Sequence, residues 1–495
     1  MSQMKNAPTS PRLRIGIWCA YHITLQPSEG IGVFAHNLAR GLAEIEPSVE
    51  VVMVTKPGDE DLMQETVQAG QGRISVRSTN RLNWTRKLFW KFNKLKLKVV
   101  TAIERTANRK VAARPKVSLK HLLAGPEGRW PPVLYPLSFV YASSRYASLK
   151  IGRAGWKSVQ RTAMQRATRI RKIVDSCQEH KGRQSEEIIQ SCDVWLVPYV
   201  GLEQEFSKPT VVTIHDLVCL HFPDMYDAEW LAIFERLSKQ VAARSTISAC
   251  MSNFICSNDL RGVLRIPENK IRVVQPAAPA DFGEPAKLDV VAENYPILRE
   301  KYIFYPSAFR RYKNHELLIA ALSELRQQDH HDLHLVFTGI HAPPKDLTDL
   351  IKDMRLETHV HVLGKVNRDV LALLYQQAVG TLVPSRYEQG SFPLMEALHW
   401  GCPIACSRIP SLVELFAPLK DAMLYFDTDD VTQVTHIIRT LLDQRTEILQ
   451  RQQSYRQLIL GRTWAEAAVD WRAVCEDAIK LHNNQPTSQT TTRAA

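Results

Sequence analysis

The sequence lacks the features of a secreted or membrane-spanning protein. Its nine cysteines are odd in number and include no Cys-x-x-Cys pair, so neither a zinc pattern nor a disulfide framework emerges. The first ten residues are polar and lack the apolar core of a signal peptide. No apolar run reaches the roughly 20 residues that a helix needs to cross a bilayer. These absences favour a reduced, cytoplasmic setting.

The sequence also lacks an internal repeat, and its 495 residues suffice for two or three domains. Apolar runs typical of buried strands alternate with amphipathic helical stretches, which predicts parallel, doubly wound α/β sheets. The expected strands are 13–20, 51–55, 194–198, 210–214, 302–306, 333–337, 359–363 and 379–383. The expected helices are 33–45, 316–325, 369–377, one that begins near residue 393, and 464–480.

Positive charge is concentrated in one segment. Residues 81–174 contain 23 Lys and Arg but 2 acidic residues, a net charge of +21, which leaves −9 for the rest of a chain whose total is +12. A helical pattern within this segment places apolar residues on one face, namely Trp84, Leu88, Phe92, Leu95 and Val99. Such a helix suits an anionic membrane interface, and it equally suits a helix packed on the protein with a solvated basic face.

We therefore expect a basic helical insertion at about residues 80–185, with an anionic membrane surface as a partner of residues 81–174. Nucleic acid would use the same cations, but the sequence contains no recognition module, so no nucleic-acid partner is expected.

Two acidic residues follow the apolar run 379–383. Glu388 lies in the loop beyond the expected strand, and Glu396 lies in the first turn of the expected helix. Ligands in open α/β sheets bind beyond the strand ends, where N–H groups at a helix start can hold a phosphate. Carboxylates there can accept hydrogen bonds from the hydroxyls of a nucleotide-activated sugar. Solvated acids on an ordinary strand–turn–helix are the alternative for the acid pair taken alone.

Two further segments could contribute to such a site. The turn 307–315 holds Arg310, Arg311 and Lys313, cations that suit a diphosphate, although a basic surface turn is the alternative. Gly30 and Gly32 precede the first expected helix and would let the backbone approach a ligand, although a tight turn explains them more simply. The Asp-x-Asp segments 59–61 and 427–429 lie in polar loops remote from this turn, so we expect no catalytic metal.

The segment 388–403 resembles the Glu-x7-Glu signature of the retaining GT-B glycosyltransferases, in the large family 4 (group 1) that includes mannosyl- and glucosyltransferases. The matching positions are Glu388, Gly390, Pro393, Glu396, Ala397, Gly401 and Pro403, with Ser391 in place of a usual glycine. The run 209–217, which contains His215, resembles the first-domain motif of this family, and the Lys313-Asn-His run resembles its phosphate-binding turn. The resemblance covers residues 12–55 and 192–480, but not the basic insertion.

The resemblance implies a GT-B fold, in which two doubly wound, Rossmann-like domains face a cleft. We expect an N-terminal acceptor-side domain at 12–280, interrupted by the insertion, and a linker at 281–300. A C-terminal nucleotide-sugar-binding domain is expected at 301–462, followed by a helix at 463–483 that crosses back to the first domain. A polar, disordered tail is expected at 484–495.

The resemblance also implies roles for individual residues. His215 and Glu388 are expected to act at the donor sugar, and Glu396 at the ribose. The diphosphate is expected to bind Lys313, Arg310 or Arg311, and N–H groups of the segment Gly390, Ser391 and Phe392. Gly30 and Gly32 are expected in an acceptor-side loop.

The implied reaction moves a hexose from a nucleoside-diphosphate sugar to a glycan or lipid-linked acceptor, with retention of configuration and without a metal or other cofactor. It would serve polysaccharide or glycoconjugate biosynthesis, in the cytoplasm or peripherally on the inner face of the membrane. The Lys-Asn-His and His-Asp-Leu runs favour mannose by resemblance. A catalytically inactive GT-B scaffold that binds membranes or polyanions is the alternative, and a GT-B phosphorylase or sugar-nucleotide epimerase is another.

Overall fold

The computed structural model describes residues 12–20, 30–56, 58–79, 185–200, 205–279, 282–328, 332–339 and 342–484. The expected basic insertion lies outside the described residues, Ser185 apart, and so does the expected tail beyond Asn484. Two parallel sheets belong to one compact unit, formed by residues 1–78 and 189–495. Within the described residues, no helix combines the length and apolar character needed to span a membrane.

The first sheet has seven parallel strands in the order β3-β2-β1-β4-β5-β6-β7. The strands are β1 (Leu13–Trp18), β2 (Val49–Thr55), β3 (Ile74–Ser78), β4 (Val194–Val197), β5 (Thr210–Thr213), β6 (Ile247–Cys250) and β7 (Ile271–Val273). Its helices include α1 (Gly30–Ile45), α2 (Gln64–Ala69), α7 (Val218–His221), α8 (Ala228–Arg244), α9 (Asn253–Ile255) and the π-helical segment η4 (Cys256–Val263). The strand order reverses between β1 and β4, which makes this pair the switch point of the sheet.

The second sheet has six parallel strands in the order β10-β9-β8-β11-β12-β13. They are β8 (Lys301–Pro306), β9 (Leu333–Thr338), β10 (Val360–Val362), β11 (Gly380–Val383), β12 (Ile404–Ser407) and β13 (Leu424–Phe426). Its helices are α10 (Leu288–Val291), α11 (His315–Gln327), α12 (Lys345–Asp353), α13 (Arg368–Gln377), α14 (Phe392–His399), α15 (Pro410–Phe416), α16 (Val431–Ser454) and α17 (Arg456–Leu460). The switch point of this sheet lies between β8 and β11.

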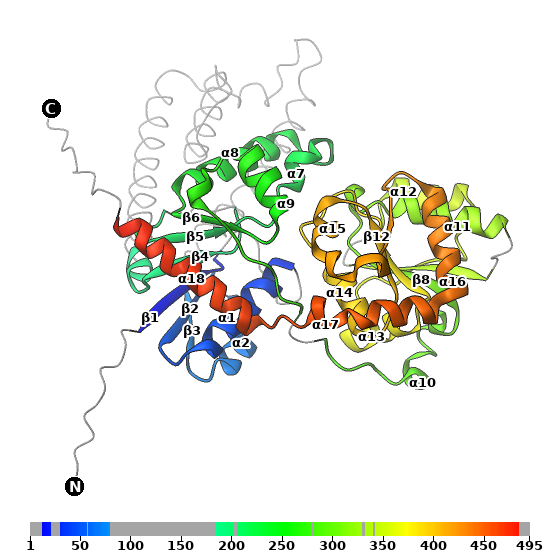
Figure 1. The fold of residues 1–495 in the computed structure, drawn as a ribbon, viewed down its shortest axis with the longest axis horizontal. Coiled ribbons are helices and arrows are strands. Elements are labelled where there is room, and N and C mark those ends of the chain that lie inside the picture. The colour runs from blue at the N-terminus through cyan, green and yellow to red at the C-terminus, as the bar shows by residue number, and fades with distance from the viewer. Residues whose placement is uncertain are drawn as a thin grey trace, which may run out of the picture. The chain divides into compact units, whose positions relative to one another are not determined.

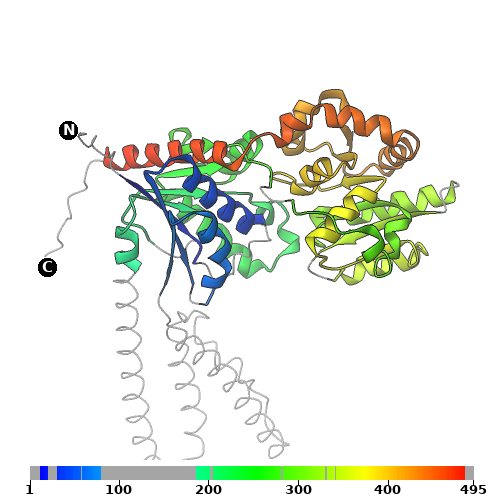
Figure 2. The same ribbon diagram turned by 90° about the horizontal axis from the view of Figure 1, so that it is seen from below.

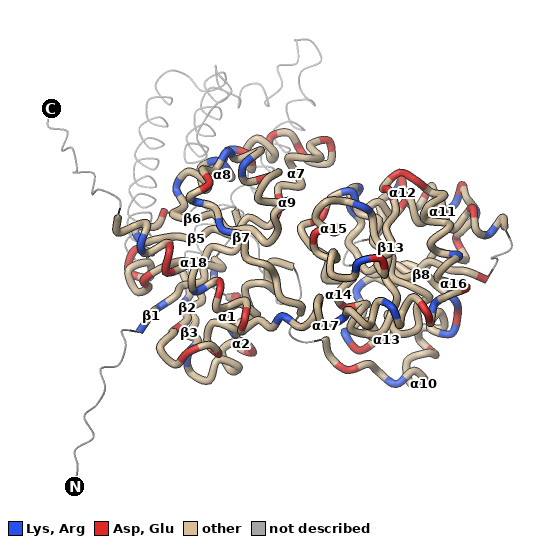
Figure 3. Tube along the Cα trace, in the orientation of Figure 1, with Lys and Arg blue, Asp and Glu red and all other residues tan. Residues whose placement is uncertain are grey.

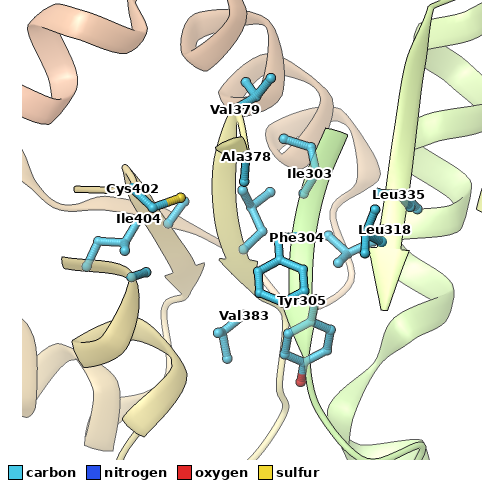
Figure 4. Close-up of a cluster of buried hydrophobic side chains, with 14 of the residues drawn as sticks. Ile303, Phe304, Tyr305, Leu318, Leu335, Ala378, Val379, Val383, Cys402 and Ile404 are labelled. Atoms are coloured by element: carbon cyan, nitrogen blue, oxygen red, sulfur yellow. The ribbon is translucent and has the colours of Figure 1, made fainter. Parts of the chain in front are cut away.

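The core of the second sheet forms because its central strands are largely apolar and buried. Side chains of β8, β9 and β12 gather with Leu318 of α11 into one buried cluster (Figure 4). Strands covered on both faces are expected to be continuously apolar in this way. Tyr305, at the end of β8, turns its hydroxyl away from the cluster, and this hydroxyl lies 3.1 Å from the Ser385 Oγ.

A last helix, α18 (Trp464–Asn483), returns to the first sheet and packs against α1 (Figures 1 and 2). The Trp464 Nε1 donates a hydrogen bond to the Ala278 carbonyl at 2.7 Å. Phe34 of α1 lies edge-on to Trp464 and Trp471, with ring centroids 6.0 and 5.3 Å away. The close approach depends on Gly41, where a Cβ would lie 2.3 Å from the Trp464 carbonyl oxygen.

The expected doubly wound α/β fold is confirmed by this architecture. Each strand and helix that the sequence predicts overlaps an observed one. The structure adds the strands β3, β6, β7, β12 and β13 and the helices α2, α7, α8, α9, α10, α12, α15, α16 and α17. Lys and Arg are interspersed with Asp and Glu over both sheet domains (Figure 3). The described part of the chain therefore shows a mixed charge distribution, unlike the basic segment 81–174 of the sequence.

Gly41→Ala is expected to lower the free energy of unfolding by about 1–3 kcal/mol, because the added methyl group pushes the α18 backbone away from α1. Gly30→Ala is the matched control in the same helix, since a Cβ at Gly30 meets no atom within 4 Å. Urea unfolding of both variants checks this. Equal midpoints would show that α18 does not depend on the contact at Gly41.

Candidate functional site

A buried ion pair lies at the switch point of the second sheet. Lys313 follows β8 and Glu388 follows β11, the two neighbouring strands between which the order reverses. The Lys313 Nζ donates to the Glu388 Oε1 at 2.5 Å, and the Ser385 Oγ donates to the same oxygen at 2.7 Å. Only 19% of the Lys313 side chain and 12% of the Glu388 side chain are exposed. Ligands of doubly wound sheets bind at this position, so the pair marks the candidate site.

The charge of Lys313 is maintained by its partner. Burial alone would lower the pKa of Lys313, but Glu388 and the neighbouring tyrosines Tyr305 and Tyr312 raise it above its ordinary value. The ammonium group also lies 5.2 Å from the centre of the Tyr312 ring, in a cation–π contact. Lys313 is therefore a fixed positive charge at neutral pH.

Asn314 joins the turn that carries Lys313 to the loop that carries Glu388. It adopts the left-handed conformation (φ 58°, ψ 41°), which asparagine tolerates better than most residues. Its amide nitrogen donates to the carbonyls of Pro384 (3.1 Å) and Thr428 (2.7 Å), and its Oδ1 accepts from the Arg386 Nη2 (3.0 Å). The side chain is completely buried, so these hydrogen bonds hold the turn and the loop together.

A cavity of about 370 Å³ opens beside Glu388 and is lined by both sheet domains. Its first-domain residues follow the carboxyl ends of β1, β4, β5, β6 and β7, and its second-domain residues surround the start of α14. The lining residues that could bind a ligand or take part in a reaction are Gly30, His215, Asp216, Glu388, Gln389, Gly390, Ser391 and Phe392. The cavity therefore brings together His215, Glu388, Gly30 and the segment 390–392, which the sequence predicts as site residues.

His215 is held at the cavity wall in one tautomer. Its Nε2 lies 2.9 Å from the Pro198 carbonyl, which can only accept, so the proton is on Nε2. Its Nδ1 lies 3.2 Å from the Gln389 Oε1, across the cavity. An unprotonated Nδ1 can only accept, so the two side chains form a hydrogen bond when the Gln389 amide turns its NH2 group toward the ring. Burial lowers the pKa of His215 to about 4, so the ring is neutral at pH 7 and Nδ1 is an acceptor. Phe34 packs edge-on to the imidazole, with ring centroids 5.1 Å apart.

Asp216 is a cavity residue that sequence reasoning noted in a motif but did not assign to the site. Its pKa is raised to about 6, mainly by burial; the nearby carboxylates Asp259 and Glu388 also raise it, whereas the Val218 N–H and Lys313 lower it. One carboxyl oxygen accepts from the Val218 N–H at 3.2 Å. The signal available in the sequence was the polar His-Asp pair directly after a buried strand.

The opposite wall of the cavity is apolar. Trp230 and Phe234 belong to α8 and Tyr226 lies just before it, and Trp230 stacks on each of the other two rings with centroids 5.3 Å apart. Trp230 is 41% exposed, so this wall continues to the protein surface. An apolar wall of this kind suits aliphatic groups of an occupant.

The other predicted site residues lie around the cavity rather than in its lining. Glu396, in α14, accepts a hydrogen bond from the Tyr375 hydroxyl at 2.7 Å, and burial raises its pKa. Arg310 and Arg311 are exposed, and Arg311 pairs with Asp224 at 3.3 Å. Gly32 is buried inside α1. Among the described residues, no group of three or more His, Cys, Asp and Glu side chains is arranged to hold a metal ion.

Comparison with known proteins identifies the second domain. Residues 292–457 match the family described as glycosyl transferases group 1. These residues form a group 1 glycosyltransferase domain. The group 1 domain contains β8–β13 and therefore both Lys313 and Glu388.

Several of the similar curated proteins are named mannosyltransferases. The chain is 26% identical over 261 residues to O-antigen chain mannosyltransferase B of Escherichia coli, which covers 52% of this chain and 65% of that protein. It is 25% identical over 246 residues to the MMP alpha-(1->4)-mannosyltransferase of Mycolicibacterium hassiacum, covering 50% and 56%. The alignments with the curated relatives thus span less than two thirds of each relative's length.

Solved structures share the fold. Anabaena HepE in complex with UDP-glucose superposes with a TM-score of 0.56 at 10% identity, covering 93% of this chain and all of that one. A sucrose-phosphate synthase from Thermosynechococcus elongatus superposes with a TM-score of 0.55 at 15% identity, covering 95% of this chain and all of that one. The expected GT-B fold is thereby confirmed.

The unfolding free energy is expected to fall by about 2–4 kcal/mol between pH 7 and pH 5. Burial lowers the pKa of His36 to about 4, of His215 to about 4 and of His315 to about 3. The unfolded histidines take up protons below pH 6.5 while the folded ones do not, so stability is lost as the pH falls from 6.5 towards 4. Asp216 opposes this, because it binds a proton more readily in the folded state.

Urea unfolding at pH 7, 6 and 5 measures how steeply the unfolding free energy changes with pH. His36→Gln, in α1 but outside the cavity lining, is expected to reduce the dependence of stability on pH, since it removes one of the three titrating rings. A stability that rises on acidification would show that the histidines are protonated in the folded protein.

Proposed function

We propose that the chain is a retaining glycosyltransferase that moves a hexose, mannose in preference, from a nucleoside-diphosphate sugar to a glycan or lipid-linked acceptor. The observation that carries the proposal is the Lys313–Glu388 pair at the switch point of a group 1 domain, next to a cavity lined by His215. The similarity to mannosyltransferases, one named for the O-antigen chain, supports mannose transfer in polysaccharide or glycoconjugate biosynthesis.

The diphosphate of the donor is assigned to the part of the site that contains Lys313 and the start of α14. Breaking the bond between sugar and phosphate leaves negative charge on the diphosphate, and preorganised positive groups stabilise that charge. Lys313 supplies a buried ammonium, and the N–H groups at the start of α14 near Ser391 and Phe392 supply hydrogen bonds. Arg310 and Arg311, exposed on the same turn, are long enough side chains to add to the diphosphate contacts.

The sugar and the ribose are assigned to the two acids. Glu388 lines the cavity and accepts hydrogen bonds from sugar hydroxyls, while the neutral His215 offers Nδ1 from the opposite wall. Glu396 accepts from the ribose hydroxyls, positioned by its hydrogen bond from Tyr375. The transfer uses charge stabilisation by side chains and main chain, so we propose that no metal takes part.

The acceptor is assigned to the remaining part of the cavity, with Gly30 at its edge. Asp216 can accept a hydrogen bond from the attacking hydroxyl, and the apolar wall at Trp230 can contact an aliphatic portion of the acceptor. A lipid-linked sugar has both an attacking hydroxyl and an aliphatic chain. This assignment connects the cavity to the basic segment 81–174, which we propose to bind an anionic membrane on the cytoplasmic side.

Thermal unfolding with GDP, UDP and ADP and their sugars tests the donor site. One nucleotide is expected to stabilise the protein by about 2.7 kcal/mol at a hundredfold excess over its Kd, because it binds the folded state alone. Glu396→Gln is expected to reduce this shift, since the amide replaces one ribose-binding oxygen by a donor. Asp421→Asn, an exposed acid paired with Arg451, is the matched control and should retain the shift.

A shift that persists unchanged in Glu396→Gln would contradict the ribose assignment. The absence of a shift with every nucleotide, together with the absence of sugar transfer in a product assay, would favour an inactive scaffold instead. Product analysis also separates transfer to an acceptor hydroxyl from phosphorolysis or epimerisation of the sugar.

Sedimentation with vesicles tests the membrane proposal. The protein is expected to co-sediment with vesicles that contain anionic phospholipid at low salt and to dissociate at about 0.5 M salt, because surface charge attraction is screened. Replacing Lys87, Lys91, Lys94 and Lys98 by Gln should weaken binding, and purely zwitterionic vesicles are the control. A protein that ignores anionic vesicles at low salt would refute membrane binding through this segment.

A further inference from the structure

A second buried carboxylate, Asp259, lies outside the cavity lining and collects four hydrogen bonds. It belongs to the π-helical segment η4 of the first domain and is completely buried. Its Oδ2 accepts from the Leu217 N–H at 2.8 Å and from the Tyr387 hydroxyl at 2.5 Å. Its Oδ1 accepts from the His221 Nε2 at 2.7 Å and from the Asn258 Nδ2 at 2.8 Å. A fully buried carboxylate with this many donors is a fixed anchor.

The bond from Tyr387 crosses from one domain to the other, because Asp259 belongs to the first domain and Tyr387 to the loop after β11. Tyr387 directly precedes Glu388 in the sequence. Its ring stacks on His221 with centroids 4.9 Å apart, and only 6% of the residue is exposed. The first domain therefore holds the residue next to the proposed sugar-binding acid.

A reciprocal contact lies beside it. Glu414, in α15 of the second domain, accepts from the Asn253 N–H at 2.8 Å and from the Phe254 N–H at 3.0 Å. These amides begin α9, which leads directly into the segment that carries Asp259. Each domain thus supplies one carboxylate that accepts hydrogen bonds from the other domain. Asp259 accepts from Tyr387, and Glu414 accepts from the start of α9. We call Asp259, Tyr387 and Glu414 the interdomain clasp.

We propose that Asp259 is a positioning residue that acts through Tyr387 to set Glu388 in the cavity, so that the donor site is complete only while the clasp is closed. This inference rests on the proposed role of Glu388.

On the other side of Glu388, Gln389 also reaches the first domain, at His215, whereas the loop residues before Tyr387 are held within the second domain. Ser407 donates to the Ser385 carbonyl at 2.5 Å, and the Arg386 N–H donates to the Tyr312 carbonyl at 2.8 Å. At Tyr387 the hydroxyl turns to the first domain instead. The loop therefore has anchors in both domains on consecutive residues, and a relative movement of the domains pulls on the residue before Glu388.

Tyr387→Phe removes the hydroxyl and keeps the ring that stacks on His221, so it is the mildest way to open the clasp. In the full-length protein, amide hydrogen exchange of residues 384–391 is expected to become about tenfold faster, which corresponds to the loss of one charge-assisted hydrogen bond. If the clasp sets Glu388, kcat for sugar transfer falls about tenfold or more while the donor KM changes by less than about twofold.

Two further variants complete the experiment. Glu414→Ala opens the clasp from its other side and is expected to accelerate exchange at residues 253–263 as well as 384–391. Tyr455→Phe is the matched control, because Tyr455 stands at the junction of α16 and α17 and belongs neither to the clasp nor to the cavity lining, and both exchange and kcat should stay at wild-type values.

Unchanged exchange at 384–391 in Tyr387→Phe would overturn the proposal. Faster exchange with an unchanged kcat would also overturn it, because the clasp would then be structural and would not position Glu388. If the wild-type protein transfers no sugar, the proposed function fails on its own account, and the exchange measurement still decides whether the clasp holds the loop.

Discussion

The candidate site depends on one buried ion pair, between Lys313 and Glu388. Neither charge could be left alone at these positions, because an unpaired buried charge costs several kcal/mol. The pair can form because β8 and β11 are neighbours in the sheet although their residues are far apart in sequence. Asn314 and Ser385 then fix the two segments against each other. The strand order of the sheet, the turn that carries Lys313 and the loop that carries Glu388 are thus all required to form the ion pair.

Support for the first-domain side of the cavity comes from the C-terminal helix. Trp464 and Trp471 of α18 pack on Phe34, and Phe34 packs on the imidazole of His215. This row of aromatic rings connects the end of the chain to the cavity wall. Because α18 follows the group 1 domain in sequence yet packs on the first sheet, the chain itself ties the two domains together.

The fold and half of the site could be predicted from the sequence for a definite reason. Strands such as β2 and β11 are almost entirely buried and mostly apolar, and Glu388 and His215 each follow a strand of this kind. The roles of Asn314 and Asp259 could not be predicted, because their partners are set by packing. Asp259 and Tyr387, for example, are 128 residues apart. The arginines of the turn could be found by charge, but not their exposure or the pairing of Arg311 with Asp224.

Burial shifts the pKa values of the base and the acid at the cavity wall in opposite directions. It lowers the pKa of His215 to about 4 and raises that of Asp216 to about 6, which favours the neutral form of each. Lys313 stays charged because Glu388 compensates for its burial. A diphosphate that binds Lys313 would replace this compensation and free Glu388 to accept hydrogen bonds from a sugar. In a cavity of low polarity such an exchange of partners is electrostatically strong. The same ion pair can therefore stabilise the empty site and prepare it for the donor.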